Sequence, residues 1–197
     1  MVFRNDQVTK MEIREIILCA QEALAVKGDF VEMGCYKGDT SLVLAEILKG
    51  TGKRLFIYDS FEGLPMKGEK DESVLGQDFR EGELKVSKRE VKERFLRAGL
   101  AVPIIKKGWF SELSDLDLPD EIAFAFLDGD FYESIKDSLR LVLPRLAKEG
   151  ILIVHDYINP ALPGVKKAVD EILKDRNLML KVKKRGSCVI MSGKGVI

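Results

Sequence analysis

The sequence predicts an α/β fold built on a doubly wound, mostly parallel sheet of about seven strands, with helices on both faces. Segments with helical spacing of apolar residues alternate with short apolar runs along most of the chain, as in consecutive β-α units. Two runs, Ile122–Leu127 and Ile151–Val154, are almost wholly apolar, which is typical of central parallel strands covered on both faces. The tail predicts a C-terminal antiparallel hairpin. Together these features indicate a Rossmann-like sheet.

The length and charge of the chain limit its class of partner. At 197 residues we expect one domain, residues 1–197, around one well-buried core. Lysine plus arginine equals aspartate plus glutamate at 32 each, so no overall field attracts nucleic acid or an anionic membrane. No apolar run approaches the roughly 20 residues of a membrane span. We therefore expect a small-molecule partner, with no nucleic acid and no membrane, and leave a homodimer open.

Cysteine usage and composition indicate the compartment and the source. Cys19, Cys35 and Cys188 are scattered and lie in apolar runs, which predicts reduced, buried thiols and a cytoplasmic protein. Charged residues are abundant, whereas glutamine and asparagine are few, a balance reported for thermophilic proteins. We expect a thermophilic source.

The first β-α-β unit is predicted from capping residues and glycines. Thr9 can cap a helix that ends near Gly28, and the strand Phe30–Cys35 follows directly. A helix over Thr40–Leu48 and a short strand over Arg54–Tyr58 complete the unit.

The next segment, residues 62–86, is polar and contains several glycines, with no sustained apolar period. Compact domains seldom carry such long loops without a functional cause, so we expect a lid or substrate-facing insertion. Ser87 and Glu90 match a capping box for a helix that runs to about Ala98, and the strand Val102–Lys106 follows.

Helical spacing returns over Tyr132–Ala147, where we expect Pro144 to kink or break the helix near its end. A further helix is predicted over Val165–Leu173. The hairpin strands are predicted over Met179–Lys183 and Cys188–Met191.

The first candidate site lies between the first strand and its helix. Glu32, Gly34 and Gly38 occur where glycines let a backbone approach a ligand and where a helix N-terminus offers free amides to a carboxylate or phosphate. The spacing differs from the G-x-G-x-x-G fingerprint of dinucleotide enzymes. The alternative is a purely structural turn.

The second and third strand ends suggest a nucleoside. Asp59 occupies the position from which a carboxylate accepts both hydroxyls of a ribose, although a turn or cap aspartate is the alternative. Trp109 and Phe110, after Gly108, offer aromatic surface for a purine, unless the tryptophan belongs to the core.

Asp128, Asp130, His155 and Asp156 follow the fourth and fifth strands and are expected to converge. Such clusters often hold a metal; oxygen ligands suit Mg²⁺, whereas an imidazole shifts the preference toward zinc, iron or manganese. The alternative is a hydrogen-bonded acidic cluster without metal.

These motifs occur together in the order found in a known family. Residues 31–38 (VEMGCYKG), 59–65 (DSFEGLP), 108–110 (GWF), 127–134 (LDGDFYES) and 155–157 (HDY) resemble the macrocin O-methyltransferase family. The resemblance implies a class I S-adenosylmethionine-dependent methyltransferase with a seven-stranded sheet. Many members of that family methylate sugar hydroxyls of antibiotics.

The resemblance also implies roles for individual residues. Glu32 and Gly34 would face the methionine end of the cofactor, Asp59 would hold the ribose, and Asp128 would lie beside the methyl-transfer centre. The full set of implied cofactor-binding residues is Glu32, Gly34, Tyr36, Gly38, Thr40, Ser41, Asp59, Ser60, Phe61, Gly108, Trp109, Phe110 and Asp128.

The resemblance further implies Mg²⁺, held by the aspartate at Asp128 and by an Asp-Asp pair where this chain has His155-Asp156. We therefore take Asp128, His155 and Asp156 as candidate catalytic residues and candidate ligands of Mg²⁺ or a softer divalent ion. His155 could instead be a neutral base that takes the acceptor proton, or be merely hydrogen-bonded beneath the pocket.

The sequence thus predicts an S-adenosylmethionine-dependent O-methyltransferase that acts on a hydroxyl of a small sugar-like or catechol-like molecule. Two alternatives remain: a non-catalytic protein that binds S-adenosylmethionine or S-adenosylhomocysteine as a regulatory or scaffold subunit, and a nicotinamide-dependent dehydrogenase. The absent phosphate fingerprint makes the dehydrogenase the weaker of the two.

Overall fold

The computed structural model describes residues 7–73, 75, 79–175 and 180–193. Within these ranges the sheet has seven strands in the order β3-β2-β1-β4-β5-β7-β6; the pairs that involve β7 are antiparallel and the others are parallel. The predicted α/β fold with a mostly parallel sheet is confirmed. The strands are β1 (Asp29–Met33), β2 (Leu55–Asp59), β3 (Ile104–Lys107), β4 (Ile122–Leu127), β5 (Leu146–Val154), β6 (Leu180–Arg185) and β7 (Cys188–Gly193).

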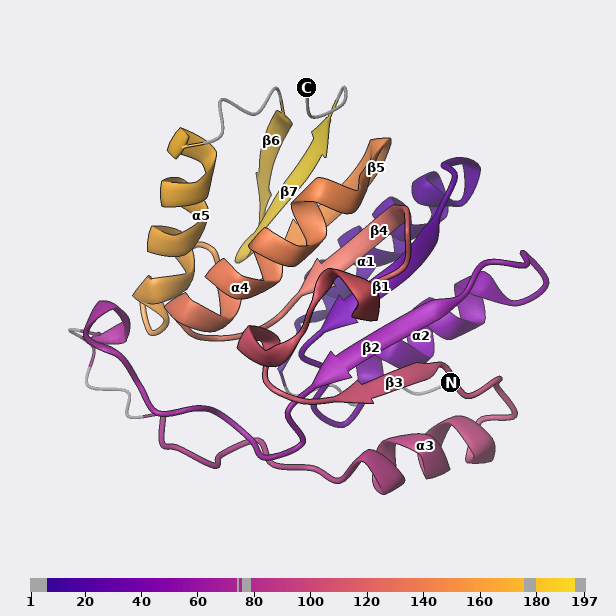
Figure 1. Cartoon of the computed structure of the whole chain (residues 1–197), viewed down its shortest axis with the longest axis horizontal. Helices are drawn as coiled ribbons and strands as arrows, with labels where there is room; N and C mark the ends of the chain where they lie inside the picture. The colour runs from indigo at the N-terminus through magenta and orange to yellow at the C-terminus, as the bar shows by residue number, and fades with distance from the viewer. Residues whose placement is uncertain (1–6, 74, 76–78, 176–179, 194–197) are drawn as a thin grey trace.

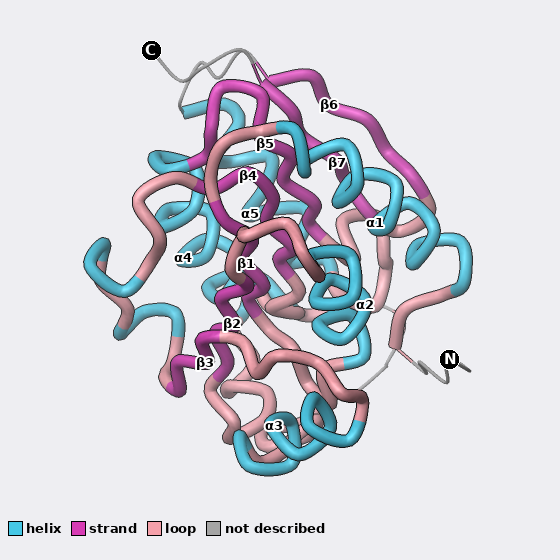
Figure 2. The backbone as a smooth tube through the Cα atoms, turned by 90° about the vertical axis from the view of Figure 1, so that its right-hand side faces the viewer, coloured by secondary structure: helices cyan, strands magenta, loops and turns pink. Residues whose placement is uncertain are grey.

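Helices cover both faces of the sheet, as Figure 1 and Figure 2 show. The α-helices are α1 (Lys10–Glu22), α2 (Asp39–Leu48), α3 (Lys88–Arg97), α4 (Tyr132–Val142) and α5 (Pro163–Asp175). Short 3₁₀ helices are η1 (Ala23–Ala25), η2 (Glu69–Asp71), η3 (Phe110–Glu112), η4 (Asp115–Asp117) and η5 (Leu143–Arg145). In the described part of the chain, no helix has both the length and the apolar character needed to cross a membrane.

Two helices begin at the cap residues that the sequence predicts, Thr9 and Ser87, and each start is a capping box. Glu12 N–H donates to Thr9 Oγ1 at 3.3 Å, and Thr9 N–H donates to Glu12 Oε2 at 2.9 Å. Ser87 and Glu90 make the same pair of bonds at the start of α3. Each box satisfies amides that have no partner inside the helix, which fixes where the helix begins.

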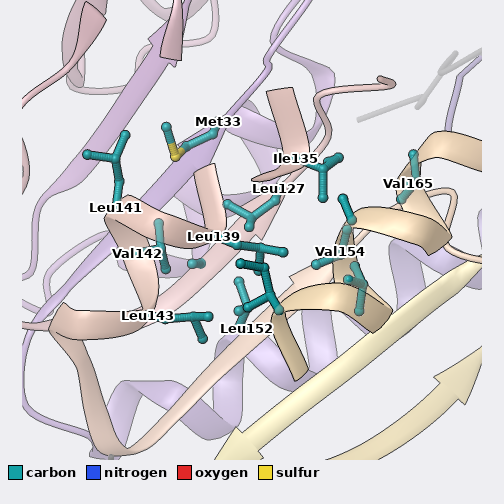
Figure 3. Close-up of a cluster of buried hydrophobic side chains, with 14 of the residues drawn as sticks. Met33, Leu127, Ile135, Leu139, Leu141, Val142, Leu143, Leu152, Val154 and Val165 are labelled. Carbon is teal, nitrogen blue, oxygen red and sulfur yellow. The ribbon is translucent and has the colours of Figure 1, made fainter. Parts of the chain in front are cut away.

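Apolar side chains fill the space between the sheet and each helical layer. α1, α2 and α3 pack on one face, and α4 and α5 on the other. Figure 3 shows the second layer, in which Leu127 of β4 faces Leu139 of α4 and side chains from β5 and α5. All six residues of β4 are buried. The strand ends that carry the candidate site are therefore held in a close-packed core.

The helix predicted over Tyr132–Ala147 ends earlier than expected. α4 stops at Val142, and η5 leads into β5 at Leu146. Pro144 has no N–H for an α-helical bond, so the chain tightens into a 3₁₀ turn. β5 is also longer than the predicted Ile151–Val154, because its first residues include the exposed Lys148 and Glu149, which break the apolar pattern.

The helix predicted to end near Gly28 is shorter: α1 stops at Glu22 and η1 continues only to Ala25, because the chain becomes extended at Val26. Other boundaries differ by one or two residues. β1 ends at Met33 rather than Cys35, because Gly34 has a positive φ of 88° and leaves the strand. β3 begins at Ile104 rather than Val102, since it pairs only with Phe56 to Asp59 of β2. The predicted start of the hairpin at Met179 lies outside the described residues.

The predicted insertion, residues 62–86, is anchored at η2. Asp71 is only 2% exposed, and its Oδ1 accepts the N–H of Tyr132 at 2.7 Å. Tyr132 opens α4, and the N-cap Phe131 has no side-chain cap, so Asp71 supplies that cap from a distant segment. Lys70 lies 3.7 Å from the centre of the Tyr132 ring and strengthens the attachment. In Figure 1, η2 lies beside the N-terminal ends of α4 and α5.

We predict that Gly164→Ala releases this anchor. A Cβ at position 164 would lie 1.7 Å from Asp71 Oδ1, so Asp71 must leave the Tyr132 amide. Loss of the buried hydrogen bond should cost about 1–3 kcal/mol in the free energy of unfolding, measured in urea. Gly68→Ala is the control, because its Cβ would meet Asp71 only at an ordinary 3.5 Å. If Gly164→Ala keeps both the wild-type stability and the wild-type rate of hydrogen exchange at the Tyr132 amide, the anchor does not hold α4.

Candidate functional site

A pocket opens at the carboxyl ends of β1, β2, β4 and β5. β1 lies between β2 and β4, where the strand order reverses, and open α/β sheets bind ligands at that point. Most of the residues predicted from the sequence line this pocket: Glu32, Gly34, Tyr36, Thr40, Asp59, Ser60, Gly108, Trp109, Phe110, Asp128, His155 and Asp156. Gly38, Ser41 and Phe61 are outside its wall.

Glu32 is a buried carboxyl with an unused acceptor. It is 1% exposed; Ser41 Oγ donates to Oε2, while Oε1 has no hydrogen-bond partner in the described part of the chain. Burial raises the pKa of Glu32 to about 8. A buried polar atom without a partner is costly, so the pocket favours a cationic or donor group beside Oε1. Ser41 thus bonds Glu32 and is not among the residues that line the pocket, whereas Thr40 is.

The loop after β1 depends on glycine. A Cβ on Gly34 would lie 2.0 Å from the backbone oxygen of Asp128, so only glycine lets the β1 and β4 loops approach this closely. Gly38, at φ 79°, is the N-cap of α2, and the first residues of that helix, Asp39 and Thr40, reach the pocket. The amides of a helix N-terminus suit an anionic ligand group there.

Asp59 ties this loop to β2. Its Oδ2 accepts the N–H groups of Cys35 at 2.8 Å and Tyr36 at 3.2 Å. Its Oδ1 accepts the N–H of Phe61 at 2.7 Å. Carboxylate oxygens have further lone pairs, so Asp59 can shape the loop and still accept bonds from a ligand at the pocket wall.

Aromatic side chains form the wall next to Asp59. Trp109 and Phe110 are half-buried and line the pocket, so Trp109 is not a core residue. Gly108 N–H donates to Asp59 O at 3.0 Å, which holds this wall against β2. Phe61 instead packs into the core at 4% exposure and is not among the residues that line the pocket.

His155 lies between two strand-end aspartates. Its Nδ1 is 3.1 Å from Asp128 Oδ1 and 2.9 Å from Asp156 Oδ2. Burial by itself lowers the pKa of His155, but the carboxylates of Asp128, Asp156 and Glu12 outweigh that effect and raise the pKa well above its usual value. The cluster therefore stabilises a positive charge on or beside the ring.

Asp130 is the pocket carboxyl with the fewest partners. It lines the pocket and makes no side-chain hydrogen bond among the described residues. Burial, and then the charges of Asp128 and Asp156, raise the pKa of Asp130 well above its usual value. A positive φ of 60° holds it in a conformation that is uncommon outside glycine. Tyr36, Leu84 and Asp156, which also line the pocket, share this conformation, and such strain clusters at functional sites.

Sequence reasoning missed some residues of this region. Gln7 and Val8 line the pocket, and Glu12 of α1 approaches His155 with 3.6 Å between Oε2 and Nε2. The neighbouring imidazole of His155 first, and then hydrogen bonds from Ser187 and Thr9, outweigh burial and hold the pKa of Glu12 well below its usual range. Thr9 predicted the start of this helix, but nothing local in the sequence indicates that Glu12 contacts residue 155.

Comparison with known proteins decides the family. The model of the family described as macrocin-O-methyltransferase (TylF) matches residues 8–190. This chain belongs to the macrocin O-methyltransferase family. The match spans every strand of the sheet except the last residues of β7, and all of the pocket-lining residues named above from Val8 onward.

Two curated proteins are similar to this chain in sequence. A Streptomyces olivaceus protein named 8-demethyl-8-(2,3-dimethoxy-alpha-L-rhamnosyl)-tetracenomycin-C 4'-O-methyltransferase is 34% identical over 71% of this chain. Demethyldecarbamoylnovobiocin O-methyltransferase of Streptomyces niveus is 31% identical over 81%. The chain spans 57% and 64% of their lengths. The solved structure of the O-methyltransferase NovP is 26% identical, with a TM-score of 0.86 over 97% of this chain and 84% of that one.

Proposed function

We propose that this protein transfers a methyl group from S-adenosylmethionine to a hydroxyl of a small molecule. The unused Oε1 of buried Glu32 is the observation that carries this proposal. The amino group of a bound methionine moiety is a cation that would satisfy it. The family match points to the same cofactor and reaction.

The residues of the pocket fit S-adenosylmethionine, which would supply an electrophilic methyl group on sulfur. Glu32 would hold the amino group, and Thr40 at the start of α2 would lie toward the carboxylate. Asp59 would accept the ribose hydroxyls, with Ser60 beside it. Trp109 and Phe110 would border the adenine.

Asp130 is our candidate for the base that takes the acceptor proton. It lines the pocket, follows the same strand as Asp128 and makes no side-chain hydrogen bond to any residue that the structure describes. Its raised pKa makes it a stronger base than an ordinary carboxylate once it is ionised. His155 suits that task less well, because its Nδ1 already faces the carboxylates of Asp128 and Asp156 at 3.1 and 2.9 Å. Most of the rate would come from holding donor and acceptor in line.

The cluster at the strand ends also fits a divalent cation. Asp128, His155 and Asp156 offer two carboxylates and one imidazole, with ligand atoms within 4.8 Å of one another. An imidazole in the donor set favours manganese, iron or zinc over Mg²⁺. Such an ion would place positive charge near the acceptor oxygen and favour its deprotonated form.

The names of the relatives indicate only the chemical class of the methyl acceptor. One relative is named for a 4'-O-methylation of a rhamnosyl group, which supports a sugar-like hydroxyl here. A catechol-like hydroxyl is the alternative. Residues 63–65 and Leu84 line the pocket, so we propose that the insertion over residues 62–86 covers the acceptor while η2 keeps it attached. A homodimer and a cytoplasmic location belong to this proposal as expectations.

A turnover assay tests the proposal. We expect purified protein to form S-adenosylhomocysteine from S-adenosylmethionine only when rhamnose-bearing glycosides or catechols are added. A regulatory or scaffold protein would bind the cofactor and show no acceptor-dependent turnover with either class. The unpartnered Asp130 favours the enzyme over that alternative, since a scaffold needs no such carboxyl.

A further inference from the structure

Glu12 links three parts of the molecule to the strand-end cluster. It lies on α1, is 5% exposed and receives donors on both oxygens. Thr9 N–H and Oγ1 donate to Oε2 at 2.9 and 2.7 Å. Ser187, in the β6–β7 turn, donates its N–H at 3.0 Å and its hydroxyl to Oε1. Glu12 is therefore held in one place by donors from two separate segments of the chain.

This fixed carboxylate faces one nitrogen of His155. Oε2 of Glu12 is 3.6 Å from Nε2, and Nε2 makes no hydrogen bond within the described residues. The other nitrogen, Nδ1, faces the carboxylates of Asp128 and Asp156. The imidazole ring thus spans the distance between α1 and the pocket.

The two nitrogens then take different tasks. An anion opposite Nε2 favours a hydrogen on Nε2, which leaves the lone pair of Nδ1 facing two carboxylate oxygens. That arrangement is repulsive unless a positive charge lies between them. We propose that Glu12 is a positioning residue that fixes the His155 ring, so that Nδ1 joins Asp128 and Asp156 in binding a divalent cation softer than Mg²⁺. This rests on the proposed function, because it adds a residue to the metal site of the same pocket.

A second cluster shares the histidine but fits a cation less well. Glu12, His155 and Cys188 have ligand atoms within 4.8 Å of one another. Both oxygens of Glu12 are already occupied by donors. The geometry therefore favours the Asp128 side of the ring.

The experiment compares metal affinity in the full chain by calorimetry with Zn²⁺, Mn²⁺ and Mg²⁺. We expect wild type to bind Zn²⁺ and Mn²⁺ more tightly than Mg²⁺, and Glu12→Gln to lose roughly 10–100-fold in Zn²⁺ affinity. The control is Glu90→Gln, which makes the same change in the matching capping box of α3 and does not touch the cluster. This control should keep wild-type Zn²⁺ affinity.

His155 is the only histidine, so imidazole ¹⁵N signals of the untagged protein report on it alone. We expect Zn²⁺ to move the Nδ1 signal while Nε2 keeps its hydrogen. Unchanged signals on adding Zn²⁺, with both nitrogens carrying hydrogen, would overturn the proposal in favour of an imidazolium. Equal Zn²⁺ affinity in wild type and Glu12→Gln would overturn it too, and so would loss of binding in Cys188→Ser.

The same samples separate this inference from the proposed function. S-adenosylhomocysteine should bind wild type and Glu12→Gln equally, because Glu12 does not line the pocket. A wild-type protein that binds Zn²⁺ through His155 but does not bind S-adenosylhomocysteine would contradict the proposed function and leave the role of Glu12 standing.

Discussion

Asp130→Asn should lower kcat for methyl transfer by roughly 10²–10⁴-fold, the usual effect of removing a general base. The amide keeps the size of the side chain but cannot accept the proton of the acceptor hydroxyl. Asp130 lines the pocket and makes no side-chain hydrogen bond within the described part of the chain, so the substitution breaks no hydrogen bond there. Affinity for S-adenosylhomocysteine should therefore stay at the wild-type level.

The dependence of activity on pH should show whether Asp130 acts in its ionised form. Because the pKa of Asp130 is raised, wild-type activity should rise as pH increases through that pKa and should fall below it, where the carboxyl is protonated. The profile of Asp130→Asn should lack this limb. Asp115→Asn changes an exposed aspartate outside the pocket and should behave as wild type. Full activity in Asp130→Asn would show that Asp130 is not the base and would leave His155 as the candidate.

Asp59→Asn should weaken S-adenosylhomocysteine binding by on the order of 1–3 kcal/mol, measured by calorimetry. The neutral amide is a weaker acceptor for ribose hydroxyls. Its NH₂ group would also face the N–H of Cys35 and Tyr36 or that of Phe61, so the loop after β1 should loosen. The loss should appear mainly as a higher Kd, since Asp59 is not beside the methyl-transfer centre.

The control for Asp59→Asn is Asp29→Asn. Asp29 begins β1, at the opposite end of the sheet from the pocket, and its Oδ1 also accepts a backbone amide, that of Arg54 at 2.8 Å. Asp29→Asn therefore repeats the change in chemistry without touching the pocket and should keep wild-type affinity. A folded Asp59→Asn protein with an unchanged Kd would exclude Asp59 from ribose binding.

The sequence predicted those features of the fold that depend on neighbouring residues, such as helix caps and apolar runs. The capping boxes at Thr9 and Ser87 fixed two helix starts, and the apolar run Ile122–Leu127 matched β4 residue for residue. The first part of β5 was missed, because pairing of Leu146 with Ile122 carries the strand through polar residues that have no apolar pattern. The anchoring of η2 by Asp71 was missed for a similar reason, since the contact is distant in sequence.

The residues of the candidate site that lie at the ends of strands were predictable from the sequence. Glu32, Asp59, Asp128 and His155 converge because the carboxyl ends of parallel strands share one edge of the sheet. The direction of individual side chains was harder to predict: Phe61 turns into the core, so sequence proximity to Asp59 did not place it in the pocket. Glu12 could not be found from sequence, because packing of α1 against the β6–β7 turn brings it to His155.

The contact between Glu32 and the cofactor's amino group is the central claim, and proton release on binding tests it most directly. In the free protein the pKa of Glu32 is about 8, so at pH 7 this carboxyl is mostly protonated. A cationic amino group beside Oε1 favours the ionised carboxylate, and the displaced proton passes to the buffer. Calorimetry in buffers of different ionisation enthalpy should show release of about one proton per S-adenosylhomocysteine at pH 7. Glu32→Gln should abolish that release. Tight binding of S-adenosylhomocysteine with no proton release, or with the same release in Glu32→Gln, would contradict the claim.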